Sequence, residues 1–126
     1  EDIRLGARTA LAALHHESAQ LLLAAGRPDA EAAASALHSL AKSFLRALQG
    51  VLYSREGSFP RDRAEAARLA RAEEADLLRA AGNAERPLAD IAAACLRWSA
   101  AGLAELPEAR NRPEGPQRRR NAGNAK

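Results

Sequence analysis

The sequence predicts an all-α protein, an antiparallel up-and-down bundle of four main helices, or five if the third is broken. Alanine occupies 33 of its 126 positions and leucine 18, and both residues favour helices over strands. Aromatic residues make up only 3%, so small side chains on closely packed helices must form most of the core. A chain of this length supplies one core, which we place in a helical domain of residues 1–106.

The first helix is predicted over about residues 3–25, where apolar side chains recur at steps of three and four. Gly26 then stands where glycine commonly follows a helix. The second helix is predicted over about residues 28–54. Pro28 suits its first turn, and Asp29 suits the positive end of its dipole.

A third helix is predicted from about residue 62 to residue 81. Asp62 followed by Glu65 resembles a capping box with Asp in the Ser/Thr place. The acidic residues within 73–76 interrupt the apolar face of this helix, so we expect a bend or break there. The fourth helix is predicted over about residues 87–106 and ends at Pro107. Burial between the second and fourth helices is predicted for Leu40, Phe44, Leu48, Ile91, Cys95 and Trp98.

Positive charge is concentrated at the end of the chain. Residues 1–106 carry 13 basic and 14 acidic side chains, whereas residues 107–126 carry six basic and two acidic ones. This second stretch has three prolines and no apolar periodicity, which predicts a disordered basic tail. Arg118, Arg119 and Arg120 allow two interpretations: a solubilising tail, or one that contacts RNA, DNA or an acidic protein. Base stacking is not supported, because the tail has no aromatic residue.

Catalytic patterns are largely missing from the sequence. It has no Gly-rich phosphate loop, no His-Glu-x-x-His motif and no cysteine pair with metal spacing. His15 and His16 would point about 100° apart on a helix, which suits one metal ion poorly. We therefore predict no metal and no cofactor, and an enzyme is the least favoured class of function.

The single cysteine, Cys95, falls on the apolar stripe of the fourth helix and is predicted to be a buried structural thiol. One cysteine fits a reducing compartment. No apolar run reaches the roughly 20 residues that span a bilayer, and no signal-peptide pattern opens the sequence. We expect a cytoplasmic protein without membrane contact. The opening Glu1-Asp2-Ile3, without Met, is expected of a domain from a longer protein, of a processed chain, or of a sequence that lacks its leading residues.

One face of the second helix is the sharpest polar feature of the chain. Opposite the apolar stripe it carries His38, Lys42, Arg46, Gln49 and Tyr53. We expect the loop that follows to add two cations, Arg55 and Arg61, to this polar stripe. One interpretation is a solvated face. The other is a site for an anion, a nucleotide or an acidic partner, bound through charge-assisted hydrogen bonds. The candidate binding residues are Lys42, Arg46, Tyr53, Arg55 and Arg61.

Residues 30–70, AEAAASALHSLAKSFLRALQGVLYSREGSFPRDRAEAARLA, resemble the second helix and following loop of the HEPN superfamily and of related helical domains that accompany minimal nucleotidyltransferases. The resemblance rests on Lys42, the Ala47-Leu48 segment and Phe59-Pro60. It implies an antiparallel bundle of four or five helices. Ribonuclease members carry an Arg and then a His near a later helix, but no histidine follows His38 here. The resemblance therefore implies a non-catalytic member.

Such a member would be an accessory or substrate-binding domain that docks on a nucleotidyltransferase-type partner. Lys42, Arg46 and Tyr53 would then face the partner or its substrate. The alternative is a helical protein-interaction module, a homodimer through its Ala-rich faces, whose basic tail contacts nucleic acid or an acidic partner. A neighbouring or upstream Gly-Ser followed by paired Asp would favour the first interpretation.

Overall fold

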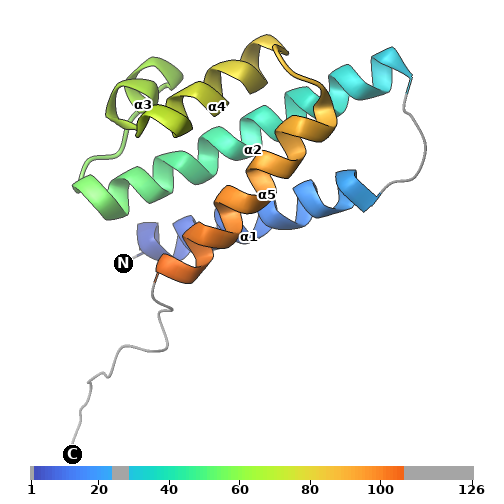
Figure 1. Ribbon diagram of the computed structural model, residues 1–126. Coiled ribbons are helices and arrows are strands. Elements are labelled where there is room, and N and C mark those ends of the chain that lie inside the picture. The colour runs from blue at the N-terminus through green and yellow to red at the C-terminus, as the bar shows by residue number, and fades with distance from the viewer. Residues whose placement is uncertain (1, 24–28, 107–126) are drawn as a thin grey trace, which may run out of the picture.

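The computed structural model describes the backbone of residues 2–23 and 29–106, with side chains from residue 6 onward. Within these ranges the chain forms five helices and no strand (Figure 1). The predicted all-α class is confirmed. The helices are α1 (Asp2–Leu23), α2 (Ala30–Glu56), α3 (Arg63–Leu69), α4 (Ala72–Asn83) and α5 (Leu88–Glu105).

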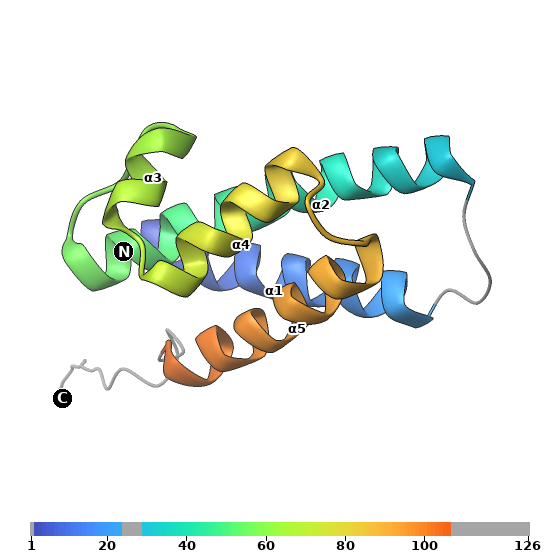
Figure 2. The same ribbon diagram turned by 45° about the horizontal axis from the view of Figure 1, so that its top comes forward.

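The four long helices run up and down. Figures 1 and 2 show α1 and α4 running in one direction and α2 and α5 in the other. Helix α2 contacts all four other helices. Helix α1 lies against both α2 and α5, while α4 lies mainly on α2. The short α3 sits beside the C-terminal half of α2 and leads into α4. This arrangement confirms the predicted antiparallel bundle.

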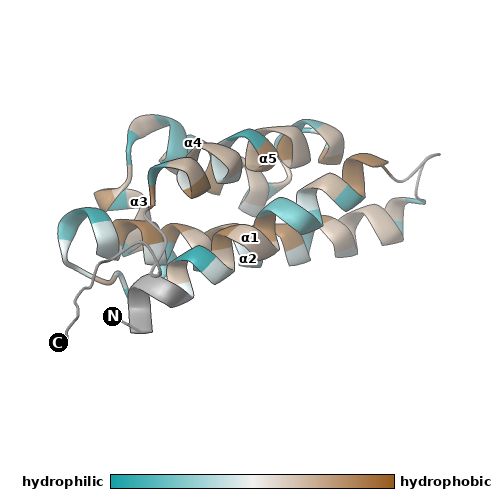
Figure 3. Cartoon of the chain, turned by 90° about the horizontal axis from the view of Figure 1, so that it is seen from below, coloured by the Kyte–Doolittle hydropathy of each residue, from teal (hydrophilic) through white to brown (hydrophobic). Residues whose placement is uncertain are grey.

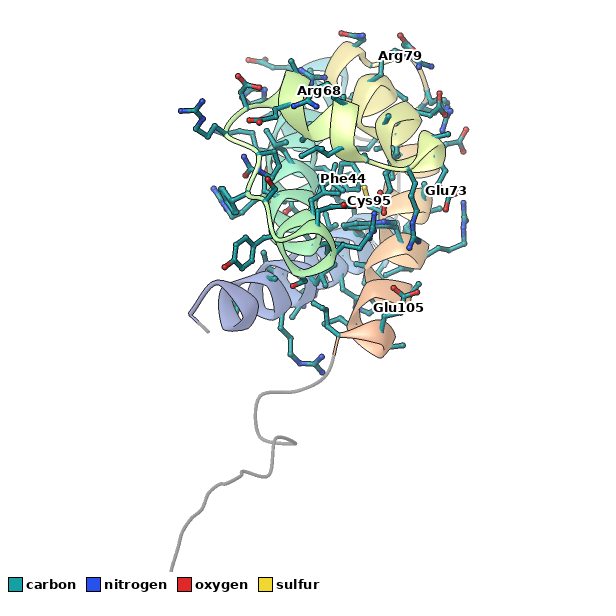
Figure 4. The ribbon with its side chains drawn as sticks, turned by 90° about the vertical axis from the view of Figure 1, so that its left-hand side faces the viewer. Phe44, Arg68, Glu73, Arg79, Cys95 and Glu105 are labelled. Atoms are coloured by element: carbon teal, nitrogen blue, oxygen red, sulfur yellow. The ribbon has the colours of Figure 1, made fainter. Side chains whose placement is uncertain are left out.

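The helices are amphipathic, as the sequence periodicity requires. Hydrophobic and hydrophilic stretches alternate along the ribbons in Figure 3. Phe44 and Cys95 lie in the interior between the helices, whereas Arg68, Arg79 and Glu105 point outward (Figure 4). None of the described helices combines the length and apolar character needed to cross a bilayer.

Five of the six predicted core residues have no exposed surface: Leu40, Phe44, Leu48, Ile91 and Cys95. The sixth prediction was wrong, because Trp98 is only partly buried. Its ring packs edge-on against Phe44, with centroids 4.8 Å apart. Its Nε1–H donates to the carboxylate of Glu74 on α4 at 2.9 Å. This bond holds the indole at the α4–α5 boundary instead of deep between α2 and α5.

Helices α1 and α2 approach closely at a glycine. A Cβ atom built on Gly50 would lie 2.7 Å from the Cβ and 2.8 Å from the Cα of Ala7. Real Cβ atoms do not come this near to other carbon atoms, so position 50 has no room for a side chain. The small residues inferred from composition therefore set the distance between these two helices.

Capping fixes both ends of α2. The Asp29 carboxylate accepts the Ala32 N–H at 2.7 Å, which satisfies a free donor of the first turn. Gly57 ends the helix with φ of +78° and donates its N–H to the Tyr53 carbonyl. Helix α2 therefore runs to Glu56, two residues further than predicted, and Arg55 is helical instead of lying in the loop.

The break in the predicted third helix exists but lies earlier than predicted. Asp62 caps α3 by accepting the Glu65 N–H, as the sequence indicated. Ala70 and Arg71 are both extended and separate α3 from α4. The acidic stretch 73–76 does not break a helix. It begins one, because the Glu74 carboxylate turns back and accepts the Arg71 N–H at 2.9 Å.

Helix α4 runs through Gly82 to Asn83, two residues beyond the predicted end at about residue 81. The left-handed cap is Ala84, with φ of +53°, whose N–H donates to the Ala80 carbonyl. The missing Cβ of Gly82 makes room for the guanidinium of Arg63 on α3. A Cβ there would lie 1.1 Å from Nη2 of Arg63.

Candidate binding face

The polar stripe of α2 divides into parts with different surroundings. His38, Lys42 and Arg46 are exposed, whereas Gln49 and Tyr53 are half-buried. The Gln49 side chain donates to the Pro60 carbonyl at 3.0 Å. It thereby holds the α2–α3 loop against the stripe and brings the start of Arg61 beside α2.

Arg55 lies away from this stripe. Nine residues separate it from Arg46 on a continuous helix, which places the two about 180° apart at 100° per residue. Its guanidinium makes two bonds to the Glu74 carboxylate, at 3.1 and 2.7 Å. The structure therefore does not bring Arg55 together with Lys42 and Arg46, although all three were candidate binding residues.

Glu74 is the centre of a buried polar network that joins three helices. Only 1% of its side chain is exposed, and it accepts bonds from Arg55 on α2, Trp98 on α5 and the Arg71 N–H. Burial alone would raise the pKa of Glu74, but these donors outweigh it and lower the pKa below the usual value. These donors to the carboxylate are all groups of the protein, and the network links helices α2, α4 and α5.

Lys42 and Arg63 meet at a pocket between α2 and α4 that has a volume of about 310 Å³. The Nη2 of Arg63 donates to the Leu78 carbonyl at 3.1 Å, which fixes the guanidinium near the C-terminal turns of α4. The polar side chains at the pocket are His38, Lys42 and Arg63, and the other lining residues are Ala34, Leu37, Ala41, Leu45, Leu78, Ala81, Gly82 and Ala84.

Lys42 and Arg46 are exposed on α2, Arg61 follows the loop residue that Gln49 holds against α2, and Arg63 lines the pocket with Lys42. We call Lys42, Arg46, Arg61 and Arg63 the basic face. Among the described residues, none of the four side chains forms an ion pair. The acids of α3 are otherwise engaged, because Asp62 caps the helix and Glu65 accepts the Arg61 N–H and pairs with Arg68. The basic face is thus free to attract an anion.

A second pocket, of about 390 Å³, lies between α4 and α5. Its rim carries Glu73 and Asp76 as well as Arg86 and Arg97, with the Trp98 ring in the wall. Asp76 is already paired with Arg79 and Arg86. The charges of this rim largely compensate one another, so it favours no class of charged ligand.

The described residues offer no metal centre, since they contain no group of three or more His, Cys, Asp or Glu side chains suited to one. Cys95 is fully buried, and that burial, with the charge of Glu17, raises the pKa of its thiol to about 12. The thiol is therefore protonated and inert at neutral pH. Arg118, Arg119 and Arg120, the tail candidates, lie outside the described residues.

Sequence reasoning missed two residues that matter here. Glu74 belongs to the acidic stretch that was predicted to interrupt an apolar face, and no role was predicted for Arg63. The sequence signal for Glu74 was weak, because a Glu at the third helical position is typical of a capping box, but Arg71 is not one of the usual N-cap residues. No local pattern marks Arg63, whose position depends on the packing of α3 against α4.

Comparison with family models, curated proteins and solved structures found no match for this chain. The resemblance to HEPN-type helices therefore rests on residues 30–70 alone.

Proposed function

We propose that this chain is a non-catalytic helical accessory or substrate-binding domain that docks on a nucleotidyltransferase-type partner through its basic face. The observation that carries the proposal is the group of four cations without an ion-pair partner among the described residues. The resemblance of residues 30–70 to nucleotidyltransferase-associated helices gives the class of partner. The face then meets an acidic surface or a nucleotide phosphate held by that partner.

The physical basis is charge complementarity on a rigid support. Lys42 and Arg46 stand one turn apart on the 27-residue helix α2, and Gln49 holds the segment that bears Arg61 against the same helix. Opposite charges across an interface mainly speed association and favour the right partner. Binding through this face should therefore weaken as salt concentration rises.

The test is a binding titration against a candidate nucleotidyltransferase encoded next to this chain, with and without a nucleotide. The double variant Lys42→Glu/Arg46→Glu reverses two charges on the face. Arg97→Glu on α5 is the matched control, because Arg97 is also exposed and forms no ion pair with any described residue, but it lies on another side of the bundle. The double variant should lose about tenfold or more in affinity, and the control should bind like the wild type.

A triple variant, Arg118→Ala/Arg119→Ala/Arg120→Ala, separates the basic face from the tail. If the triple variant loses binding and the double variant retains it, the tail is the charged contact and the proposal for the basic face is wrong. Equal binding by all variants would also refute the proposal. Sedimentation of the chain alone reports separately on the homodimer alternative.

A further inference from the structure

The pocket between α2 and α4 has the form of a small-molecule site. One wall comes from Leu37, Ala41 and Leu45 on α2, and the other from Leu78 and Ala81 on α4. Its volume of about 310 Å³ lies at the lower end of the range for ligand pockets. Mostly apolar walls with a few polar groups are typical of such pockets.

The charged groups at this pocket are all of one sign. Lys42 and Arg63 contribute cations and His38 an imidazole, and no carboxylate is among the described residues that line it. The pocket lies at the C-terminal end of α4, where the last carbonyls and the helix dipole disfavour an anion. Arg63 counters that effect, because its Nη2 donates to the Leu78 carbonyl while its other N–H groups have no partner among the described residues.

The position of Arg63 is set by the backbone beside it. Gly82 leaves the space that the guanidinium occupies, so any side chain there would displace it. Lys42 stands across the pocket on α2. We call the leucine and alanine side chains of the two walls the apolar floor of the pocket. The pocket thus combines this apolar floor with one anchored guanidinium and one ammonium group.

We propose that this pocket binds a small amphipathic anion, a compound with a short apolar body and a carboxylate or phosphate at one end. The apolar body would lie against the leucine and alanine floor, where its burial is favourable. The anionic end would lie between Lys42 and Arg63, since a guanidinium and an ammonium both form charge-assisted hydrogen bonds with such groups. This site goes beyond the proposed docking, because it requires no protein partner.

The experiment is a nuclear magnetic resonance titration of the full ¹⁵N-labelled chain with four probes that share one apolar body. Octanoate and octyl phosphate are the two anions, 1-octanol is the neutral compound, and octylammonium is the cation, each kept below its micelle concentration. The amide signals of Lys42, Gly82 and Ala84 should shift with both anions. The affinity for 1-octanol should be about tenfold lower, and octylammonium should not bind.

Three variants test this site, and one of them, Ala41→Leu, also separates it from the docking face. Gly82→Ala should displace the Arg63 guanidinium without changing any charge and should weaken octyl phosphate binding about tenfold. Ala41→Leu should fill the apolar floor and abolish binding, yet it leaves the basic face complete, so docking on a protein partner should survive. Arg97→Met on α5 is the control and should bind like the wild type.

Circular dichroism and urea unfolding establish whether each variant is folded. If Ala41→Leu does not fold, Gly82→Ala still tests the pocket. Equal affinity for octanoate and 1-octanol would overturn the proposal. Shifts confined to the amides around Trp98 and Arg97, or no shift at millimolar concentrations, would overturn it as well. Whichever anion binds more tightly identifies the head group.

Discussion

Gly50 is a point of close approach between two helices. Its missing Cβ lets α2 approach Ala7 of α1, with no space for even one methyl group. Composition alone indicated small residues at helix contacts, but it could not say which of eight glycines had this role. Only the packing of one helix against another singles out this position.

Gly50→Ala should destabilise the protein by about 1–3 kcal/mol, because the new methyl group overlaps Ala7. Gly6→Ala on α1 is the matched control. No atom of the described residues lies within 4 Å of the Cβ that Gly6 would carry, so that change should stabilise by about 0.5–1 kcal/mol through helix propensity. Urea unfolding of both variants measures the difference. A stabilised Gly50→Ala variant would show that α1 and α2 do not meet at Gly50.

The Arg55 guanidinium protects a buried charge. Arg55→Ala should lower the free energy of unfolding by about 3–5 kcal/mol, because it leaves the Glu74 carboxylate buried without its cation. Arg68→Ala removes a more exposed ion pair with Glu65, whose nearest atoms are 3.6 Å apart, and should cost less than about 1 kcal/mol. Similar losses in the two variants would mean that Glu74 is solvated.

Acid stability should depend on Glu74. Its pKa is lowered in the folded protein, so the unfolded chain takes up the proton first as the pH falls. The network therefore contributes its full stability above the unfolded pKa of about 4.5 and loses it as the pH drops through the lower folded value.

Glu74→Gln should be less stable than the wild type at neutral pH, and the difference should shrink toward pH 3. Emission from Trp98, the only tryptophan and a donor to this carboxylate, reports the transition directly. A difference that stays constant with pH would contradict the role of the Glu74 carboxylate.

Most helices could be predicted at the element scale because their signals are local. Periodic alanine and leucine placed α1, α2 and α5, and Asp62 marked the start of α3. The end of α2 and the α3–α4 break were displaced by interactions that sequence spacing does not reveal. Gly57 allowed α2 to continue past Arg55, and the tertiary contacts of Glu74 made an apparent interruption into a helix start.

The cap of α4 is strained, which gives a prediction at this scale. Ala84 has φ of +53°, a conformation that costs a residue with a Cβ about 1–2 kcal/mol. Ala84→Gly should therefore stabilise the protein by about 1 kcal/mol. Ala100→Gly, at an exposed position inside α5, should destabilise it by about 1 kcal/mol. Thermal unfolding of both variants decides whether α4 ends in a left-handed cap.

At the scale of the whole molecule, the candidate site is a product of tertiary packing. The sequence could place Lys42 and Arg46 on one helix face because helical periodicity is fixed. It could not exclude Arg55, whose pairing with Glu74 depends on α4. Nor could it include Arg63, which meets α2 only because α3 and α4 fold over that helix.

The central claim is that this bundle binds its partner through the basic face of α2 and α3. Hydrogen exchange of the full chain, alone and mixed with the candidate nucleotidyltransferase, tests that claim most directly. Slower exchange should appear in residues 38–46 and 61–66, while α5 exchanges as before. Protection confined to α1 and α5, with residues 38–46 unchanged, would contradict the claim.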